Sequence, residues 1–595
     1  MPSNPTKLAS LFAQAQAQIQ LPAGSSSSSA APSPNMADST APSLGIISYT
    51  SGSRDVHCSP QKLKRRQMQY GPLLHPSYLY ASHQAKGALP DPVEEEPPLF
   101  YLLTTYISYL ILIIFGHVRD FFGKRFKKEK YQHLIQQNVG LPLTSDFDSF
   151  YVRRLKERLD DCFSRPTISV PGRYVTILDR ESKDHNRTFK FTGTTTDALN
   201  LSSYNYLGFA QSEGQCADAA EEIVHRYGMS SGSSRAEAGT TDLHLETEEL
   251  IARFVGKESS MLFSMGYATN GAAFPSLVSK GCLIISDELN HASIRFGARM
   301  SGAVIKTCKH NDMRDLEHLL REEISQGQPR THRPWKKILV VVEGLYSMEG
   351  TMCNLPTLVE LKKKYKFYLF VDEAHSIGAI GPRGRGVCDY FGIDPREIDI
   401  LMGTLTKSFG ATGGYISADK AIIDRLKLDN MGYVYAEPMS PPVLGQIEAA
   451  IRTIMGEIVP GEGDERLQRI AFNSRYLRLG LKRLGFIISG HDDSPILPLM
   501  LYSPAKMPAF SREMLKRNIA VVVVGYPATP LVSSRVRLCL SSALNKDDLD
   551  VILRACDEVG DMLMLKFRPD EHPRWKLEDI IRKGVMDCKR DELED

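Results

Sequence analysis

A single lysine, Lys407, lies among small and hydroxylic residues directly after an apolar segment. The stretch runs Gly403-Thr404-Leu405-Thr406-Lys407-Ser408-Phe409-Gly410-Ala411-Thr412-Gly413-Gly414, and residues 398–402 before it are typical of a buried strand. A lysine held at a strand end in a narrow pocket can lose its proton and attack a carbonyl carbon. A lone lysine after a strand is more often a solvated loop residue, so the choice depends on what else the chain offers.

A second apolar segment, residues 367–371, ends at Asp372 and is followed closely by His375. Alone, an aspartate at a strand end most often caps a helix. Pyridoxal phosphate chemistry needs a lysine that binds the aldehyde and an acid that keeps the pyridine nitrogen protonated. Asp372 and Lys407, each after an apolar strand, therefore predict a site for pyridoxal 5'-phosphate. Lys407 would also be the base that removes the α-proton, which requires partial burial to lower its pKa.

Apolar strand-like segments alternate with amphipathic helical segments through the middle of the chain. Residues 281–286 and 338–342 have strand character, and residues 355–365 have the pattern of a crossover helix. This alternation predicts an α/β fold with a mainly parallel sheet. Ligands of such sheets bind at the carboxyl ends of the strands. Asp372 and His375 are expected at that edge.

A glycine-containing turn between a predicted strand, 259–263, and a helix is the candidate phosphate site. Glycine lets backbone amides approach an anion, and a helix N-terminus adds partial positive charge. Gly266, Tyr267 and Ala268 are therefore expected to bind the phosphate, with hydroxyls from Thr404 and Thr406. Taken alone, the same residues would be read as a simple strand-to-helix turn.

These segments together resemble the α-oxoamine synthases, a family of fold type I pyridoxal phosphate enzymes that join an amino acid to an acyl-CoA with loss of carbon dioxide. The resemblance covers roughly residues 195–565. It implies that His291, in Asp-Glu-Leu-Asn-His-Ala-Ser, stacks on the cofactor ring and that His375 bonds its phenolic oxygen. Ser347 would lie near that oxygen or near the aldimine. Asn205, in Asn-Tyr-Leu-Gly, would help to hold the substrate carboxylate.

Arg537 is the predicted clamp for that carboxylate. It lies in Arg535-Val536-Arg537-Leu538-Cys539, whose alternation indicates a strand with both arginines on one face. A guanidinium can bind a carboxylate bidentately, and the family carries such an arginine in a matching strand. Without the family, two solvent-facing arginines would be an equal interpretation.

Within the family the resemblance is closest to the lysine-bearing subunits of serine palmitoyltransferases. It implies condensation of L-serine with palmitoyl-CoA to 3-ketosphinganine, CoA and carbon dioxide, and a heterodimer with a related subunit that lacks the lysine. The basic loop 330–337 could meet CoA phosphates or be solvated. Two alternatives stay open: another α-oxoamine synthase, of the aminolevulinate or 2-amino-3-ketobutyrate type, and a non-catalytic membrane scaffold on the same fold.

Residues 99–118 hold no formal charge apart from a possible His117, and their number is about what crosses a hydrocarbon core. Acidic residues precede them and basic residues follow, which by the positive-inside rule places the catalytic part in the cytosol. A membrane segment suits an enzyme with lipid-like substrate and product, here at the endoplasmic reticulum. A helix in the membrane plane and a core helix are the other interpretations.

The remaining composition is that of an ordinary globular protein, with 42% hydrophobic and 24% charged residues and a net charge of +2. Nucleic acid and metal are not expected, and the ten scattered cysteines indicate free thiols in a reducing compartment. No cleaved signal peptide is expected. The predicted parts are a disordered tail (1–97), a membrane-associated helix (98–118), a helical and β segment (119–198), the catalytic large domain (199–440), a smaller C-terminal α+β domain (441–567) and a charged tail (568–595).

Overall fold

The computed structural model of the chain describes residues 69–72, 75–83, 89, 97–126, 150, 154, 156–526, 528–568 and 574–588. All of them belong to one compact unit, residues 55–595. Predictions for the rest of the 1–97 tail, for residues 127–149 and for residues 589–595 lie outside the described residues.

A seven-stranded sheet with the order β4-β10-β9-β8-β7-β5-β6 forms the centre of the large domain. Strand β10 is antiparallel to both of its neighbours, whereas β6, β5, β7, β8 and β9 run parallel. The predicted mainly parallel seven-stranded sheet is therefore confirmed. Its strands are β4 (Ser259–Phe263), β5 (Leu283–Asp287), β6 (Val304–Cys308), β7 (Ile338–Glu343), β8 (Tyr368–Asp372), β9 (Ile400–Thr404) and β10 (Gly414–Ala418).

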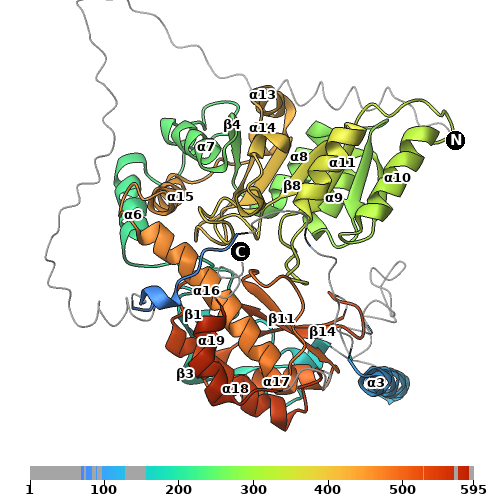
Figure 1. Cartoon of the computed structure of the whole chain (residues 1–595), viewed down its shortest axis with the longest axis vertical. Helices are drawn as coiled ribbons and strands as arrows, with labels where there is room; N and C mark the ends of the chain where they lie inside the picture. The colour runs from blue at the N-terminus through green and yellow to red at the C-terminus, as the bar shows by residue number, and fades with distance from the viewer. Residues whose placement is uncertain are drawn as a thin grey trace, which may run out of the picture. The chain divides into compact units, whose positions relative to one another are not determined.

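Helices cover this sheet because its central strands are apolar on both faces. Strand β7, for example, reads Ile-Leu-Val-Val-Val before its terminal Glu343, and five of its six residues are buried. Figure 1 shows α8, α9, α10 and α11 packed around the strands near β8. The helices of this domain are α6 (Gln215–Tyr227), α7 (Asp242–Val255), α8 (Gly266–Leu277), α9 (Ala292–Ser301), α10 (Met313–Gln326), α11 (Leu355–Tyr365), α12 (Val387–Phe391), α13 (Lys420–Asp429), α14 (Met431–Val434) and α15 (Pro441–Ile454).

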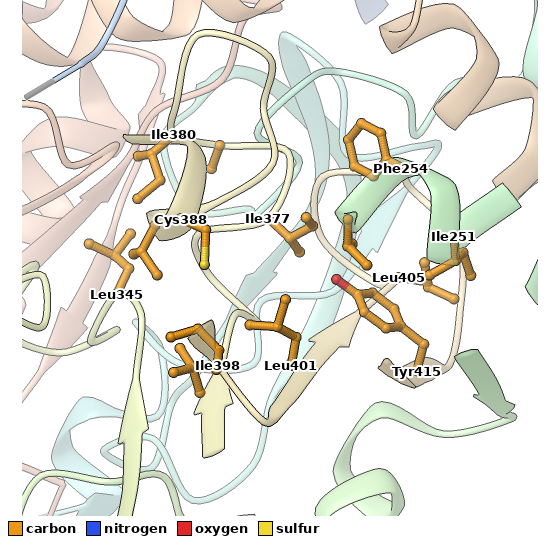
Figure 2. Close-up of a cluster of buried hydrophobic side chains, with 14 of the residues drawn as sticks. Ile251, Phe254, Leu345, Ile377, Ile380, Cys388, Ile398, Leu401, Leu405 and Tyr415 are labelled. Atoms are coloured by element: carbon orange, nitrogen blue, oxygen red, sulfur yellow. The ribbon is translucent and has the colours of Figure 1, made fainter. Parts of the chain in front are cut away.

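The segment that carries Lys407 is anchored in the main apolar core. Leu401 and Leu405, on either side of the end of β9, are buried with Tyr415 of β10, and Figure 2 shows them among Ile251 and Phe254 of α7. Gly403 has no room for a β-carbon, because the ring of Tyr415 occupies that place. The end of β9 is thus fixed before the lysine begins its turn.

The smaller domain combines a second apolar core with two small sheets. One sheet has the order β11-β14-β13 and the other β1-β2-β3-β12, and Figure 1 shows α16 to α19 beside β11 and β14. The strands are β1 (Thr167–Ile168), β2 (Tyr174–Glu181), β3 (Lys190–Asn200), β11 (Ile496–Tyr502), β12 (Ile519–Ala520), β13 (Val522–Val524) and β14 (Ser534–Cys539). The helices are α16 (Glu462–Arg483), α17 (Lys506–Lys516), α18 (Lys546–Met562) and α19 (Leu577–Asp587).

Three predicted boundaries are wrong. Helix α15 packs on α6 and α7 within the core of the large domain, so that domain extends past residue 440. Residues 69–72 and 75–83, assigned to a disordered tail, pack on the folded body, with Tyr80 buried and Gly71 donating its N–H to Ala543. The charged tail after residue 567 contains α19, whose Ile580 is buried against the second core.

Helix α3 (Leu99–Phe126) extends the predicted 98–118 segment by eight residues at its C-terminal end. It is the one helix among the described residues that is long and apolar enough to cross a membrane, with a mean hydropathy of 2.0 over its most apolar window. Its buried residues, Thr105, Tyr109, Gly116 and Asp120, form one stripe along the helix. The remaining surface exposes large apolar side chains, including Leu103, Leu110 and Phe115.

Candidate active site

Four strands of the large sheet end in polar residues at one edge. Strands β5, β7, β8 and β9 end at Asp287, Glu343, Asp372 and Thr404, and all four residues are buried. Glu343 pairs in register with Asp372 on the neighbouring parallel strand. Lys407 lies three residues after Thr404, so the lysine and the acid that the sequence singled out lie at the same carboxyl edge.

Asp372 is held by two neutral donors. One carboxylate oxygen accepts a hydrogen bond of 2.8 Å from the side-chain amide of Asn270, and the other accepts one of 2.9 Å from the N–H of Ala374. The side-chain oxygen of Asn270 is buried without a partner. Because both donors are neutral, these bonds fix the direction of the carboxylate without neutralising its charge.

Lys407 lies in the turn between β9 and β10, where its side chain is half-buried. Burial lowers the pKa of its amine from 10.5 to about 8, although Asp372 and Glu343 act in the opposite direction. The predicted reduction of the lysine pKa by partial burial therefore agrees with the structure. Such an amine can both act as a nucleophile and exchange a proton near neutral pH.

Glu343 and His291 are linked at the start of α9. The carboxylate of Glu343 accepts a hydrogen bond of 2.5 Å from the backbone N–H of His291. Burial raises the pKa of Glu343 well above its ordinary value, and the neighbouring Asp372 raises it further. The exposed imidazole of His291 bonds Ser293 through Nδ1 at 2.8 Å, which leaves its ring face open beside Tyr267, whose centroid lies 5.9 Å away.

Two tyrosines from the loop after β3 surround His375. The hydroxyl of Tyr206 is hydrogen-bonded to Nδ1 of His375 at 2.8 Å, and the ring of Tyr204 lies edge-on to the imidazole at 5.0 Å. Burial, and then the charge of Lys407, lower the pKa of His375 well below its ordinary value. The imidazole is therefore neutral at physiological pH.

Arg537 reaches the same place from β14 of the smaller domain. Its guanidinium carbon lies 4.7 Å from the ring centroid of Tyr204, and the Lys407 amine lies 5.6 Å from that centroid. Only 8% of Arg537 is exposed, and its Nε has no hydrogen-bond partner. A buried donor without an acceptor is suited to binding an anion. Solvent-facing arginines, the alternative interpretation, are not what the structure shows.

Arg535 and Arg537 do lie on one face of β14, and both contact Met348. Arg537 approaches its sulfur at 3.6 Å, and Arg535 donates to its carbonyl at 2.9 Å. Ser347, which precedes Met348, is half-buried in the turn after β7. Its predicted place beside the cofactor is compatible with this turn and stays a prediction.

The turn before α8 is the candidate anion site. Helix α8 begins at Gly266 without a capping side chain, which leaves the first backbone N–H groups to face outward. A β-carbon on Gly266 would lie 2.6 Å from the hydroxyl oxygen of Thr404. The hydroxyls of Thr404 and Thr406 lie 2.8 Å apart. The predicted group of Gly266, Tyr267, Ala268 and the two threonines is thus brought together.

Asn205 differs from the other candidates, because both ends of its amide are engaged within the loop. The nitrogen donates to the carbonyl of Pro171 at 2.9 Å, and the oxygen accepts from the N–H of Ala210 at 3.2 Å. Its proposed contact with the substrate carboxylate stays a prediction. Its neighbours Tyr204 and Tyr206, which the sequence did not single out, enter the site instead. The motif that contains them could be recognised in the sequence, but the neighbouring residues did not indicate which of its side chains faces Lys407.

The basic loop 330–337 lies at the opposite edge of the sheet. Lys336 donates its N–H to Gly281, just before β5, and Lys337 directly precedes β7. Both are at the amino ends of parallel strands, whereas Lys407 is at the carboxyl ends. The loop therefore does not face the active site of its own chain, and CoA contacts from it are not supported.

The residues present fit pyridoxal phosphate. The uncapped helix start, the space kept open by Gly266 and the two threonine hydroxyls suit a phosphate. Lys407, Asp372 and the open face of His291 suit the aldehyde, the ring nitrogen and the ring. Among the described residues no cluster of metal-binding side chains competes for this place.

Comparisons with known proteins agree with this geometry. Residues 196–555 match the family described as Aminotransferase class I and II. The chain is 60% identical over 536 residues to serine palmitoyltransferase 2 of Kluyveromyces lactis, covering 89% of this chain and 95% of that protein. It is 58% identical over 544 residues to serine palmitoyltransferase 2 of Saccharomyces cerevisiae, covering 90% and 97%.

Among solved structures, a serine palmitoyltransferase with pyridoxal phosphate bound as the internal aldimine matches with a TM-score of 0.61 and 27% identity. The match covers 71% of this chain and all of that one. The expected fold type and cofactor are confirmed. The chain belongs to the serine palmitoyltransferases, within the class I and II aminotransferase family of fold type I pyridoxal phosphate enzymes.

Proposed function

We propose that this chain is the lysine-bearing subunit of a serine C-palmitoyltransferase, which condenses L-serine with palmitoyl-CoA to give 3-ketosphinganine, CoA and carbon dioxide. The observation that carries the proposal is the grouping of Lys407, His375 and Arg537 around the ring of Tyr204, beside Asp372. It places Lys407, which can transfer a proton, close to Arg537, which can bind a carboxylate. The names of the relatives supply the substrate class.

Bound pyridoxal phosphate supplies an electron sink for negative charge at the α-carbon of the amino acid. The protein residues divide the remaining work. Asp372, oriented by Asn270, keeps a proton on the ring nitrogen. Lys407, with its pKa near 8, removes the α-proton of serine. His375 is neutral and hydrogen-bonded to Tyr206, so it can offer a hydrogen bond without adding charge.

Arg537 binds the carboxylate of serine in this proposal. Its unpartnered Nε and its stacking on Tyr204 give a fixed, desolvated donor, and charge-assisted bonds are strongest in such places. Binding the carboxylate also orients the amino acid before carbon dioxide leaves. Because Arg537 lies in β14, the smaller domain would hold the carboxylate while the large domain provides Lys407.

The test is a titration of the purified chain with serine, glycine and alanine, followed by visible absorption and by assay of the long-chain ketone product. A cofactor band that responds chiefly to serine, with product formed from palmitoyl-CoA, is the expected result. A response to glycine instead would indicate the aminolevulinate or 2-amino-3-ketobutyrate type. Absence of any band would favour the non-catalytic scaffold.

The partner subunit is part of the proposal. Met265, Tyr267, Phe296 and Met300 are large apolar side chains that stay exposed around the start of α8 and along α9, and the rings of Tyr267 and Phe296 contact each other at 6.4 Å. An apolar surface beside a cofactor site suits a second subunit. We expect Phe296→Asp to abolish co-purification with a lysine-lacking subunit, whereas Val551→Asp, an exposed apolar residue on α18, should not.

The membrane is the second proposed partner, at the endoplasmic reticulum with the catalytic domains in the cytosol. Along α3, Tyr101 packs on Phe567 at 4.5 Å and the hydroxyl of Tyr109 lies 3.4 Å from that of Ser534. Further along, Asp120 pairs with Arg154. These contacts cover about 28 Å of the helix length. A helix that crossed the bilayer would carry this folded protein surface into the hydrocarbon, so we propose that α3 lies in the interface plane.

Labelling in sealed microsomes distinguishes the two orientations. Single cysteines at Pro98 and Phe126, both exposed, would be introduced in a Cys58→Ser background, because every other cysteine is buried. In-plane attachment predicts that a membrane-impermeant thiol reagent labels both sites from the cytosolic side. Labelling of one site only, until detergent is added, would instead support a full crossing.

A further inference from the structure

A short segment upstream of the membrane helix lies against the active-site loop. The anchor segment, residues 69–72, begins at Gln69, whose side-chain amide donates to the hydroxyl of Ser212 at 2.7 Å and accepts from the N–H of Ser212 at 3.0 Å. The carbonyl of Gln69 accepts from the N–H of Arg173 at 3.0 Å, and the N–H of Gly71 donates to Ala543 at 2.9 Å. The segment is thus fixed at both ends.

Tyr70 is the residue of this segment that touches the loop. Its ring lies against Gly208, where a β-carbon would approach ring carbons to 3.0 and 3.1 Å. Gly208 also has a φ of +69°, so the close approach and the backbone both favour glycine. Two guanidinium carbons, of Arg466 and Arg469, lie 4.3 and 4.8 Å from the Tyr70 ring centroid.

Arg466 connects Tyr70 to the loop a second time. Its guanidinium donates to the carbonyl of Leu207 at 2.5 Å and lies 4.4 Å from the ring centroid of Phe209. The side chain is buried and paired with Glu462. Tyr70 and Phe209 therefore share one buried cation, which couples the anchor segment to the loop backbone.

The same loop supplies the aromatic residues of the site. Tyr204 contacts Lys407, His375 and Arg537, and Tyr206 bonds His375. The loop is also held by the N–H of Ser542, which donates to the Tyr206 carbonyl at 2.7 Å. The anchor segment and the 541–543 segment, which are bonded to each other through Gly71 and Ala543, thus both hold the loop.

We propose that Tyr70 is a positioning residue, which acts through Gly208 and Arg466 to hold Tyr204 and Tyr206 in their places beside Lys407. The expected effect of Tyr70 on turnover rests on the proposed function, whereas its expected effect on the order of the loop does not. Removing the residues ahead of α3 would then disturb the active site even though α3 is retained.

The test compares hydrogen–deuterium exchange of residues 204–210 in the full chain purified with pyridoxal phosphate. Three variants are measured beside the wild type: Tyr70→Ala, Tyr70→Phe and Tyr78→Ala. Tyr78 is the matched control, because it also lies upstream of α3 and packs on α16 through Phe472, at 5.8 Å, without contacting the loop. Tyr70→Leu replaces Tyr70→Ala if the alanine variant does not fold.

We expect Tyr70→Ala to accelerate exchange in residues 204–210 by about tenfold, from loss of the cation–π and packing contacts. Tyr70→Phe keeps the ring and should stay within about twofold of the wild type, as should Tyr78→Ala. Turnover with serine should fall only where exchange accelerates. Unchanged exchange in Tyr70→Ala, or equal acceleration in Tyr78→Ala, would overturn the proposal. Exchange is measured without substrate, so failure of the proposed function would not affect it.

Discussion

The two edges of the seven-stranded sheet use charge in opposite ways. At the amino edge, Asp399 pairs with Lys362 at 2.8 Å and also accepts the N–H of Leu369 at 2.7 Å. At the carboxyl edge, Asp372 accepts bonds from neutral donors, and its neighbour in register is another acid, Glu343. At the amino edge, a neighbouring lysine neutralises the charge of Asp399. At the carboxyl edge, the charge of Asp372 remains available to a ligand.

The arrangement of charges at the carboxyl edge shifts the pKa values of the groups there. Burial beside like charge raises the pKa of Glu343 far above its ordinary value, and burial lowers that of Lys407 to about 8. Perturbed groups of this kind cluster where chemistry occurs. The amino edge, with its matched ion pairs, contributes to the fold, and the carboxyl edge is left to the cofactor and substrate.

The largest expected effect separates two lysines at the two edges. Lys407→Ala should lower turnover with serine and palmitoyl-CoA by at least about a thousandfold, because the proton-transfer group is lost. Lys362→Ala removes a cation of the amino edge and should leave turnover within about twofold. The measurement is product formation at saturating substrates, with circular dichroism as a check of folding. Near-normal turnover in Lys407→Ala would mean that the carboxyl edge does not carry the catalytic lysine.

A pair of aspartates tests the same contrast with a smaller change. Asp372→Asn keeps the size of the side chain but removes the charge that holds a proton on the ring nitrogen, so turnover should fall about a hundredfold. Asp399→Asn breaks the pair with Lys362 and should lower the thermal midpoint while turnover is retained. Equal losses of turnover in both variants would show that the two edges are not functionally distinct.

Much of the carboxyl edge could be predicted from the sequence, because each of its polar residues lies next to the apolar run that forms its strand. An apolar run that ends in Asp372, and another that leads to Lys407, specify both the strand and the place of the polar group. The same holds for the uncapped turn at Gly266. Parallel strands then bring these ends together without further information.

The rest depended on contacts between distant parts of the chain. Tyr204 contacts Lys407 from a loop after β3 that the distant 541–543 segment helps to hold, and no local pattern encodes that contact. The repeats, serine run and prolines of residues 1–97 predicted disorder for the whole tail, yet Tyr80 within it is buried against α16. Composition describes how much apolar surface a segment carries and not whether a neighbour covers it.

Arg537 tests whether the smaller domain contributes to the carboxyl edge, because it faces that edge from β14. Arg537→Ala should raise the KM for serine by about 10- to 100-fold, which corresponds to a lost charge-assisted bond. Arg535→Ala is the control on the same face of β14, since its donors already bond the carbonyls of Ser533 and Met348. It should lower stability while the KM for serine changes little. An unaltered serine dependence in Arg537→Ala would assign the carboxylate to another residue.

The smallest effect concerns stability rather than turnover. Glu373, next to Asp372, is buried, and burial raises its pKa from 4.5 to about 7. The native state then retains a proton between these pH values that the unfolded chain has released. Its contribution to stability is therefore complete below pH 4.5 and is lost as the pH rises to about 7, by on the order of 3 kcal/mol.

Glu373→Gln stays neutral and can still accept the N–H of Val387. Its thermal midpoint should therefore rise relative to the wild type between pH 5 and pH 7. Glu397→Gln at the amino edge alters an exposed pair with Lys363 and should shift the midpoint equally at both pH values. Parallel curves for Glu373→Gln and the wild type would mean that Glu373 is ionised in the native state, and that the carboxyl edge neutralises its acids as the amino edge does.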